Sequence, residues 1–231
     1  MIRLFNQDCM EAMREMPDKA YELAIVDPPY GIGIFTCDKH TDPIKGRVKN
    51  IKNYNDNYTW NTETPQTEYF CELQRVSKHR IIWGANYYNC FENNNAALVW
   101  FKGEQTKNVS ACEIASLSFQ TKCDLVHINW QSGFYRKLYE NIIHPCQKPV
   151  KLYEWLLKNY AKPGDKILDT HCGSGSILIA CDIMGYSIDA YEIDKDYFEA
   201  AKARLERHQQ QAVMTFDRPA APIQMEALIC E

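Results

Sequence analysis

Four consecutive residues near the start of the chain combine an acid, two prolines and an aromatic ring. Asp27, Pro28, Pro29 and Tyr30 follow the apolar run 23–26, which has the length and branched side chains of a buried strand. The prolines make this loop stiff and hold the Asp27 and Pro28 carbonyls outward. A carboxylate beside a carbonyl can accept both hydrogens of one amino group, and Tyr30 adds a flat face next to them. The tetrapeptide therefore predicts a site for a planar amine, and a proline-rich surface turn is the simpler alternative.

A glycine-rich turn between two strands is the second candidate site. A strand over 166–169 leads into Gly173 and Gly175, and the strand after the following helix ends at Glu192. Glycines let a ligand lie against the backbone, and Glu192 stands where a carboxylate can accept both hydroxyls of a ribose. The dinucleotide fingerprint needs a third glycine where Leu178 stands, so NAD is disfavoured. A nucleoside ligand without a pyrophosphate, such as S-adenosylmethionine, fits better, and an ordinary βαβ turn with a surface acid is the alternative.

Strands and helices must alternate to place these two sites, and the apolar pattern supplies that alternation. Short branched runs predict strands over 2–5, 21–27, 81–83, 97–101, 115–119, 166–169 and 187–191. Helices are predicted over 9–16, 66–78 and 150–160, and a further one opens at 177. Such alternation is typical of an α/β protein, in which ligands bind at the carboxyl ends of the parallel strands.

The composition limits the class of protein. The chain of 231 residues has room for one large or two small domains, and its net charge of −4 does not by itself point to a nucleic-acid partner. Ten cysteines stand singly without a CxxC pair, which argues against a zinc site and a disulfide framework. No apolar stretch reaches membrane-spanning length, and the N-terminus lacks a signal-peptide pattern. We therefore expect a cytoplasmic protein with reduced thiols, no metal and no membrane segment.

With these motifs in place, the chain resembles the amino-group DNA methyltransferases. In that family Asp-Pro-Pro-Tyr is the catalytic motif, and an acid followed by a glycine turn is the cofactor motif. The catalytic motif comes first here, which is similar to the permuted β-class order. Two further segments are similar to family elements: His144-Pro145-Cys146-Gln147-Lys148-Pro149 to a His-Pro-x-x-Lys-Pro turn, and Asn6-Gln7-Asp8-Cys9 to the segment before the catalytic strand. Together the matches cover residues 2–35 and 142–205.

The resemblance implies a Rossmann-like class I methyltransferase fold with a mostly parallel, seven-stranded sheet flanked by helices. It implies one domain over residues 1–208 and a tail over 209–231. The residues that it places at S-adenosylmethionine are Asp8, Cys9, Asp27, His144, Lys148, Asp169, His171, Cys172, Gly173, Gly175 and Glu192. Asp8 would contact the adenine end, Lys148 would lie near the methionine end and Glu192 would hold the ribose. One departure is Thr170-His171-Cys172, because the family usually has Pro-Phe after the acid.

The implied reaction moves a methyl group from sulfonium sulfur to an exocyclic amino nitrogen. Asp27 and the Pro28 carbonyl would localise the nitrogen lone pair and aim it, and Tyr30 would stack on a base extruded from duplex DNA. An Asp at the first motif position goes mostly with adenine in this family, so Asp27 favours adenine N6. Cytosine N4 is the alternative, methylation of RNA or of protein glutamine is weaker, and a catalytically silent DNA-binding subunit is a hypothesis of a different class.

Two segments are left for contacts with double-stranded DNA. A mobile loop over 36–60 carries Lys45, Arg47, Lys49 and Lys52, although a solvated loop is an equally good interpretation of such a run. A small target-recognition region over 100–141 carries Arg136 and Lys137. Because this region is small, we expect a short recognition site or help from a second protomer in a homodimer.

Overall fold

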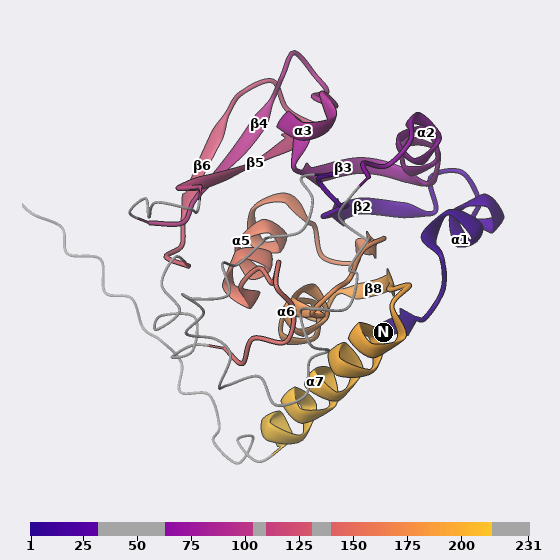
Figure 1. Cartoon of the computed structure of the whole chain (residues 1–231), viewed down its shortest axis with the longest axis vertical. Helices are drawn as coiled ribbons and strands as arrows, with labels where there is room; N and C mark the ends of the chain where they lie inside the picture. Colours follow the sequence, from indigo (N-terminus) through magenta and orange to yellow (C-terminus); the bar gives the residue numbers. More distant parts are fainter. Residues whose placement is uncertain (32–62, 104–109, 131–139, 214–231) are drawn as a thin grey trace, which may run out of the picture.

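The computed structural model describes residues 1–31, 63–103, 110–130 and 140–213. These residues form one α/β sheet with helices on both faces (Figure 1). The strands are β1 (Ile2–Phe5), β2 (Tyr21–Val26), β3 (Ser77–Trp83), β4 (Ala97–Phe101), β5 (Cys112–Leu117), β6 (Asp124–His127), β7 (Lys166–Asp169) and β8 (Ser187–Tyr191). Their order in the sheet is β1-β8-β7-β2-β3-β5-β4-β6, and β5 alone among them runs antiparallel to its neighbours β3 and β4.

The helices divide between the two faces of the sheet. They are α1 (Cys9–Glu15), α2 (Thr67–Val76), α3 (Ala85–Tyr88), α5 (Val150–Tyr160), α6 (Ser176–Met184) and α7 (Lys195–Val213). One face packs against α5, α6 and α7, and the other packs against α1 and α2 (Figure 1). Among the described residues, no helix is both long enough and apolar enough to cross a bilayer.

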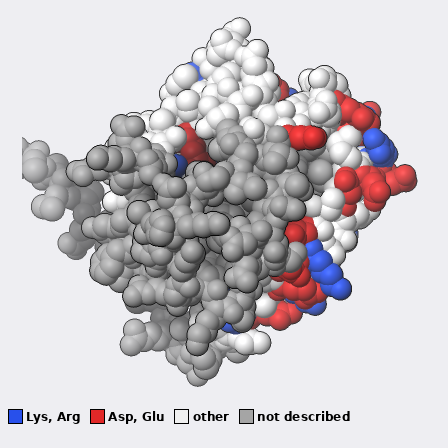
Figure 2. Space-filling view, in the orientation of Figure 1, with Lys and Arg blue, Asp and Glu red and all other residues white. Residues whose placement is uncertain are grey.

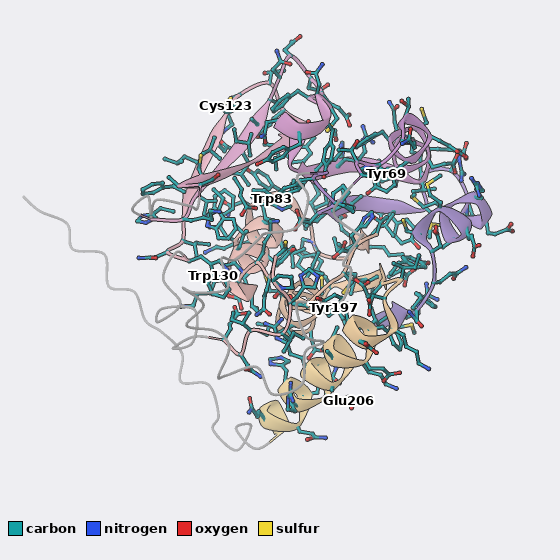
Figure 3. The ribbon with its side chains drawn as sticks, in the orientation of Figure 1. Tyr69, Trp83, Cys123, Trp130, Tyr197 and Glu206 are labelled. Carbon is teal, nitrogen blue, oxygen red and sulfur yellow. The ribbon has the colours of Figure 1, made fainter. Side chains whose placement is uncertain are left out.

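Strand β2 shows why the sheet is covered on both faces. Successive side chains of a strand point to opposite faces, and here both sets are apolar. Leu23 and Ile25 lie in the cluster under α5 and α6, whereas Ala24 and Val26 lie in the cluster under α1 and α2. Trp83 at the end of β3 is fully buried in the first cluster, between the sheet and α5 (Figure 3). The central strands are thus fixed from both sides, which holds their carboxyl ends in place.

The expected α/β class and mostly parallel sheet are confirmed, but the sheet has eight strands instead of seven. The additional strand is β6, in a segment where the sequence predicted no strand. It pairs only with β4 at the sheet edge, and its alternation buries Val126 while Leu125 stays 68% exposed. A four-residue edge strand with one inward apolar side chain leaves almost no periodic signal in the sequence.

Other elements also differ from expectation in their bounds or in their presence. Strand β3 begins at Ser77 instead of 81, because Arg80 is buried through an ion pair with Glu92 and so takes an inward position despite its charge. Helix α3 was not expected at all. Helix α7 continues to Val213, so the first residues of the expected 209–231 tail are helical, as the helix-forming glutamines at 209–211 allow. Residues 214–231 lie outside the described part of the chain.

A buried arginine fastens α7 to the rest of the domain. The Arg204 guanidinium donates to the Ser174 carbonyl at 2.8 Å, to the Ser176 hydroxyl at 2.9 Å and to the Glu140 carboxylate. Ser174 stands within the glycine-rich turn, so this contact also fixes the turn from behind. Glu140 in turn accepts the backbone N–H of Val150, where α5 begins.

Replacing Arg204 tests how much the buried ion pair between Arg204 and Glu140 contributes to the stability of the fold. Arg204→Met should lower the free energy of unfolding in urea by about 3 kcal/mol or more, because it leaves the Glu140 carboxylate buried without its cation. Adding Glu140→Gln should restore part of the loss by removing that charge. The matched control is Arg14→Met, which breaks an exposed ion pair with Glu68 and should cost less than about 1 kcal/mol. Equal losses at Arg14 and Arg204 would contradict the assignment.

Candidate active site

The carboxyl ends of the central strands bring the two sequence motifs together. Asp27 follows β2 directly, and Asp169 is the last residue of β7, which pairs with β2 in parallel. Glu192 follows β8 on the far side of β7. Parallel strands end at one edge of a sheet, so the tetrapeptide and the glycine-rich turn become neighbours although they are over 140 residues apart in the sequence.

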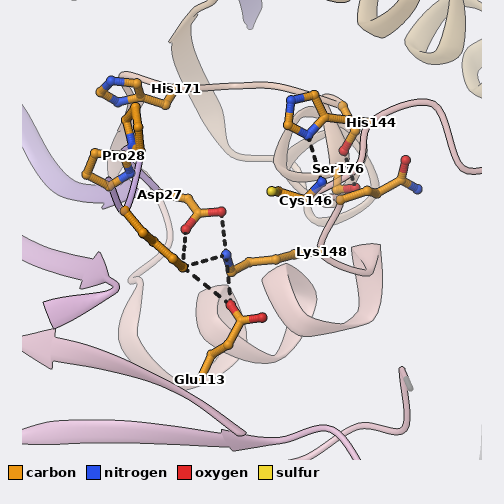
Figure 4. Close-up of polar contacts among 12 residues, drawn as sticks. Asp27, Pro28, Glu113, His144, Cys146, Lys148, His171 and Ser176 are labelled. Atoms are coloured by element: carbon orange, nitrogen blue, oxygen red, sulfur yellow. Dashed lines mark hydrogen bonds and ion pairs between the residues drawn. The ribbon is translucent and has the colours of Figure 1, made fainter. Parts of the chain in front are cut away.

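Lys148 stands at the centre of a buried ion cluster at this edge (Figure 4). Its ammonium group donates to the Asp27 carboxylate, lies 3.1 Å from the Glu113 carboxylate and donates to the Tyr30 hydroxyl at 3.2 Å. Lys102 pairs with the other oxygen of Glu113 at 3.0 Å. The Lys148 side chain is only 4% exposed. We call these five residues the Lys148 cluster; its two carboxylates and two ammonium groups balance in charge.

The pKa values within the Lys148 cluster follow from this balance. Burial acts to raise the pKa of Glu113, but Lys148 and Lys102 outweigh it and hold that pKa at about 2. The Lys148 pKa lies above its usual value, because the two carboxylates outweigh the effect of burial. Burial raises the pKa of Asp27, and the charge of Lys148 only partly opposes this. Asp27 is therefore the carboxylate in the cluster with the greater affinity for a proton.

Helix α3 holds the catalytic-motif loop from outside. The Tyr88 hydroxyl donates to the Pro28 carbonyl and, at 2.9 Å, to the Pro29 carbonyl. The Pro28 carbonyl that we expected to receive an amine hydrogen thus already accepts one hydrogen bond and keeps a second lone pair. Tyr30 donates its hydroxyl to Asp27 Oδ1 at 2.6 Å. The loop is therefore held in one conformation by direct contacts as well as by its prolines.

The glycine-rich turn and its acid form a second fixed unit. The Gly173 N–H donates to Glu192 Oε2 at 2.8 Å, and the Asp194 N–H donates to Oε1 at 2.9 Å. Each carboxylate oxygen has a second lone pair besides the one that accepts the backbone N–H. Glu192 can therefore also accept hydroxyl hydrogens. Gly175 has a φ of 71° where α6 begins, a left-handed conformation that favours glycine. Asp169 is buried and accepts the His171 N–H at 3.0 Å.

The other residues expected at the cofactor lie along the same edge in mainly structural contacts. Asp8 caps α1 by accepting the Met10 N–H at 2.6 Å. Burial raises the pKa of Cys9 to about 12 and raises the pKa of Cys172 well above its usual value, so both thiols stay protonated. Burial lowers the pKa of His144 and of His171 to about 4, so both rings are neutral near pH 7.

Four residues belong to this site although the sequence motifs gave no sign of them: Glu113, Lys102, Tyr87 and Tyr88. Because β5 runs antiparallel to β3, its first residues, including Glu113, lie at the edge where β3 ends. Lys102 follows β4, which ends at the same edge. The signal that could have found Glu113 is a lone acid opening an otherwise small and apolar strand.

The six residues expected to contact DNA lie outside the described part of the chain. These are Lys45, Arg47, Lys49, Lys52, Arg136 and Lys137. On the face shown in Figure 2, the described residues carry both signs of charge along the right-hand side and form no continuous basic patch. No group of three or more His, Cys, Asp or Glu that could hold a metal ion occurs among the residues described.

A pair of glycines with the same backbone conformation tests the packing of Tyr30. Gly84 and Gly185 have φ values of 75° and 76°, but a Cβ at Gly84 would lie 2.4 Å from Tyr30 Cε1, whereas nothing lies within 4 Å at Gly185. Gly185→Ala should cost about 1–2 kcal/mol from backbone strain alone. Gly84→Ala should cost clearly more and disturb the Tyr30 ring. The unfolding midpoints of both variants measure these costs. Equal losses of stability would show that the Tyr30 ring moves aside without an energetic cost.

The buried Asp169 carboxyl predicts a pH-dependent stability. Burial and the charges of Asp27 and Glu192 raise its pKa to about 8 in the folded protein, against about 3.9 in the unfolded chain. The folded state thus holds the proton more tightly, and this contribution to stability is lost as pH rises from about 4 through 8. Asp169→Asn should resemble the wild type at pH 5 and melt at a higher temperature at pH 9. A Tm difference that stays constant from pH 5 to 9 would contradict the assignment.

Comparisons with known proteins address the identity of this site. A family model described as DNA methylase, which groups N6 and N4 enzymes, matches residues 21–203. The type II methyltransferase M.HpaI of Haemophilus parainfluenzae is 24% identical over an alignment of 247 residues. The alignment covers 88% of this chain and 74% of that protein. Putative methylase YubD of Escherichia coli (strain K12) is 22% identical over 217 residues, with 89% and 90% covered.

Solved structures support the fold. The M1.HpyAVI–SAM complex superposes with a TM-score of 0.53 at 18% identity, over 89% of this chain and all of that one. The cytosine-N4-specific PvuII DNA methyltransferase superposes with a TM-score of 0.58 at 13% identity, over 90% of each chain. At these identities the likeness concerns the fold alone, and the family match adds the chemistry. The chain belongs to the N6 and N4 family of DNA methylases.

Proposed function

We propose that this DNA methylase transfers a methyl group from S-adenosylmethionine to adenine N6 in duplex DNA. Membership of the family gives the reaction class and the methyl donor. The observation that carries the choice of residues is the Asp27 carboxylate beside the Pro28 carbonyl, held at the carboxyl edge of the sheet next to the turn with Glu192. The chemistry then takes place between β2 and β7.

The cofactor is proposed to lie along the glycine-rich turn. Glu192 would accept the ribose hydroxyls, and Gly173 and Gly175 leave room for the nucleoside to lie against the backbone. Asp8 is proposed for the adenine end and Lys148 for the methionine end, with His144, Asp169, His171 and Cys172 along the wall between them. In this proposed arrangement the sulfonium group would face Asp27.

The Lys148 cluster prepares Asp27 for its task. Lys148 and Tyr30 hold the carboxylate in one orientation, so the amino group meets an acceptor that needs no reorganisation. Hydrogen bonds from the amine to Asp27 and the Pro28 carbonyl localise the nitrogen lone pair and aim it at the methyl carbon. The nitrogen–carbon bond forms as the carbon–sulfur bond breaks, and the sulfonium charge is lost. The amino group then releases one proton, for which Asp27 is the nearest acceptor.

The choice of adenine rests on Asp27 at the first position of the motif. A cytosine-N4 enzyme is among the structural neighbours, so cytosine N4 is the second candidate. We further propose a single domain that reaches the DNA through the loop 36–60 and the region 100–141, either alone or as a homodimer in the cytoplasm. In duplex DNA the target base must leave the stack before it can reach Asp27.

Transfer of labelled methyl groups to genomic DNA lacking methylation tests the proposal. The wild type should label the DNA, and hydrolysis to nucleosides should yield N6-methyladenine. Asp27→Ala should lower transfer at least 100-fold while the Tm increase caused by S-adenosylmethionine is kept, because Asp27 acts on the amine. The matched control is Asp18→Ala, an exposed acid in the loop before the same strand, which should transfer normally.

The outcomes separate the candidate functions. Labelled N4-methylcytosine would replace adenine by cytosine and leave the roles of the residues unchanged. Cofactor binding without any transfer by the wild type would favour a silent DNA-binding subunit. Normal transfer by Asp27→Ala would overturn the mechanism.

A further inference from the structure

Tyr87 covers the ring of the catalytic-motif tyrosine. The rings of Tyr30 and Tyr87 are stacked, with centroids 4.8 Å apart and planes inclined by 16°. Tyr30 reaches inward, because its hydroxyl bonds to Asp27, whereas Tyr87 is 43% exposed. Tyr87 belongs to neither of the two buried apolar clusters among the described residues. Its main ring contact is thus with the aromatic ring nearest the proposed chemistry.

The two tyrosines of the short helix α3 have different environments. Tyr88 is anchored by the carbonyls of Pro28 and Pro29, and its ring packs against the edge of Tyr30. Tyr87 lies at the surface on the same turn. The helix begins after Gly84 and ends before Asn89, both in the left-handed conformation, so it forms a compact and well-defined support. A change of side-chain rotamer at Tyr87 therefore needs no movement of the helix or of the loop.

A base that stacked on the Tyr87 side of the Tyr30 ring while meeting Asp27 would take the place that Tyr87 now fills. The Tyr30 hydroxyl lies 2.6 Å from Asp27 Oδ1, so a base whose amino group meets that carboxylate lies alongside the Tyr30 ring. Flat rings stack at van der Waals separation, about 3.5–4 Å. The layer next to Tyr30 is occupied by Tyr87. Entry of a base on that side would move Tyr87 outward by one ring thickness, about 3.5 Å.

We propose that Tyr87 is a second stacking residue for the target base, which enters between the Tyr30 and Tyr87 rings. Without DNA, Tyr87 closes over Tyr30 and excludes water from its face. With DNA, Tyr87 covers the outer face of the extruded base and retains it during transfer. This inference rests on the proposed function, because it assumes that an aromatic base is brought to Asp27. Every nucleobase has a π-face, so the contact adds retention without selecting the base.

Two substitutions at Tyr87 separate stacking from other roles. Tyr87→Ala should lower kcat/KM for unmethylated DNA by 10- to 100-fold, since base stacking on one aromatic side chain has that magnitude. Tyr87→Phe keeps the ring and should stay within twofold of the wild type. Both variants should keep the Tm increase caused by S-adenosylmethionine, because Tyr87 faces the base. Equal kcat/KM values for the Ala and Phe variants, or a higher value for Ala, would overturn the proposal.

A fluorescent base analogue gives a readout that a purely structural role would not move. Sequencing the methylated DNA identifies the target position, and 2-aminopurine, or a fluorescent cytosine analogue if cytosine is methylated, is placed there in a duplex. In the wild-type complex and the Phe variant, stacking on both faces should quench the emission. In the Ala complex one face is open, so the bound analogue should be brighter. Equal brightness in all three complexes would overturn the proposal, whereas absence of methyl transfer by the wild type would instead overturn the proposed function.

Discussion

The ion pair between Lys148 and Asp27 is the constraint on which the catalytic edge depends. A buried charge without a partner costs several kcal/mol, and this cluster buries four charged groups together. Each charge is stabilised by the others, so Asp27 after β2 depends on Lys102 after β4 and on Glu113 in β5. The strands that carry these residues must keep their order and direction for the charges to meet. The arrangement of charges at this edge therefore depends on the topology of the sheet.

The reversed strand β5 has a role that a fully parallel sheet could not provide. In a parallel strand, the residues that reach the catalytic edge come after the strand has ended and lie in loops. Because β5 runs the other way, Glu113 reaches this edge from within the strand, where its backbone pairs with Trp100 of β4. The carboxylate that contacts Lys148 is thereby built on a strand of the sheet, whereas the groups proposed to meet the substrate come from loops.

The sequence predicted those parts of the site that directly follow a strand of apolar residues. Asp27 and Glu192 each stand after such a run, and the short apolar runs located their strands to within a few residues. Glu113 left no comparable signal, because its contribution depends on strand direction, which local composition does not encode. Tyr87 and Tyr88 lie in a helix of four residues, too short for any periodicity. The strand β6 was missed since only one of its four side chains is buried.

The burial of Cys172 and the partial burial of Cys9 have a consequence for an enzyme that handles an alkylating agent. S-adenosylmethionine is an electrophile, and a thiolate is a much better nucleophile than an aromatic amine. Cys172 stands within the glycine-rich turn, and Cys9 opens the helix beside it. Burial raises the pKa of both thiols, so the thiolate population is negligible near neutral pH. The close packing that shapes this edge thus also protects the protein from methylating itself.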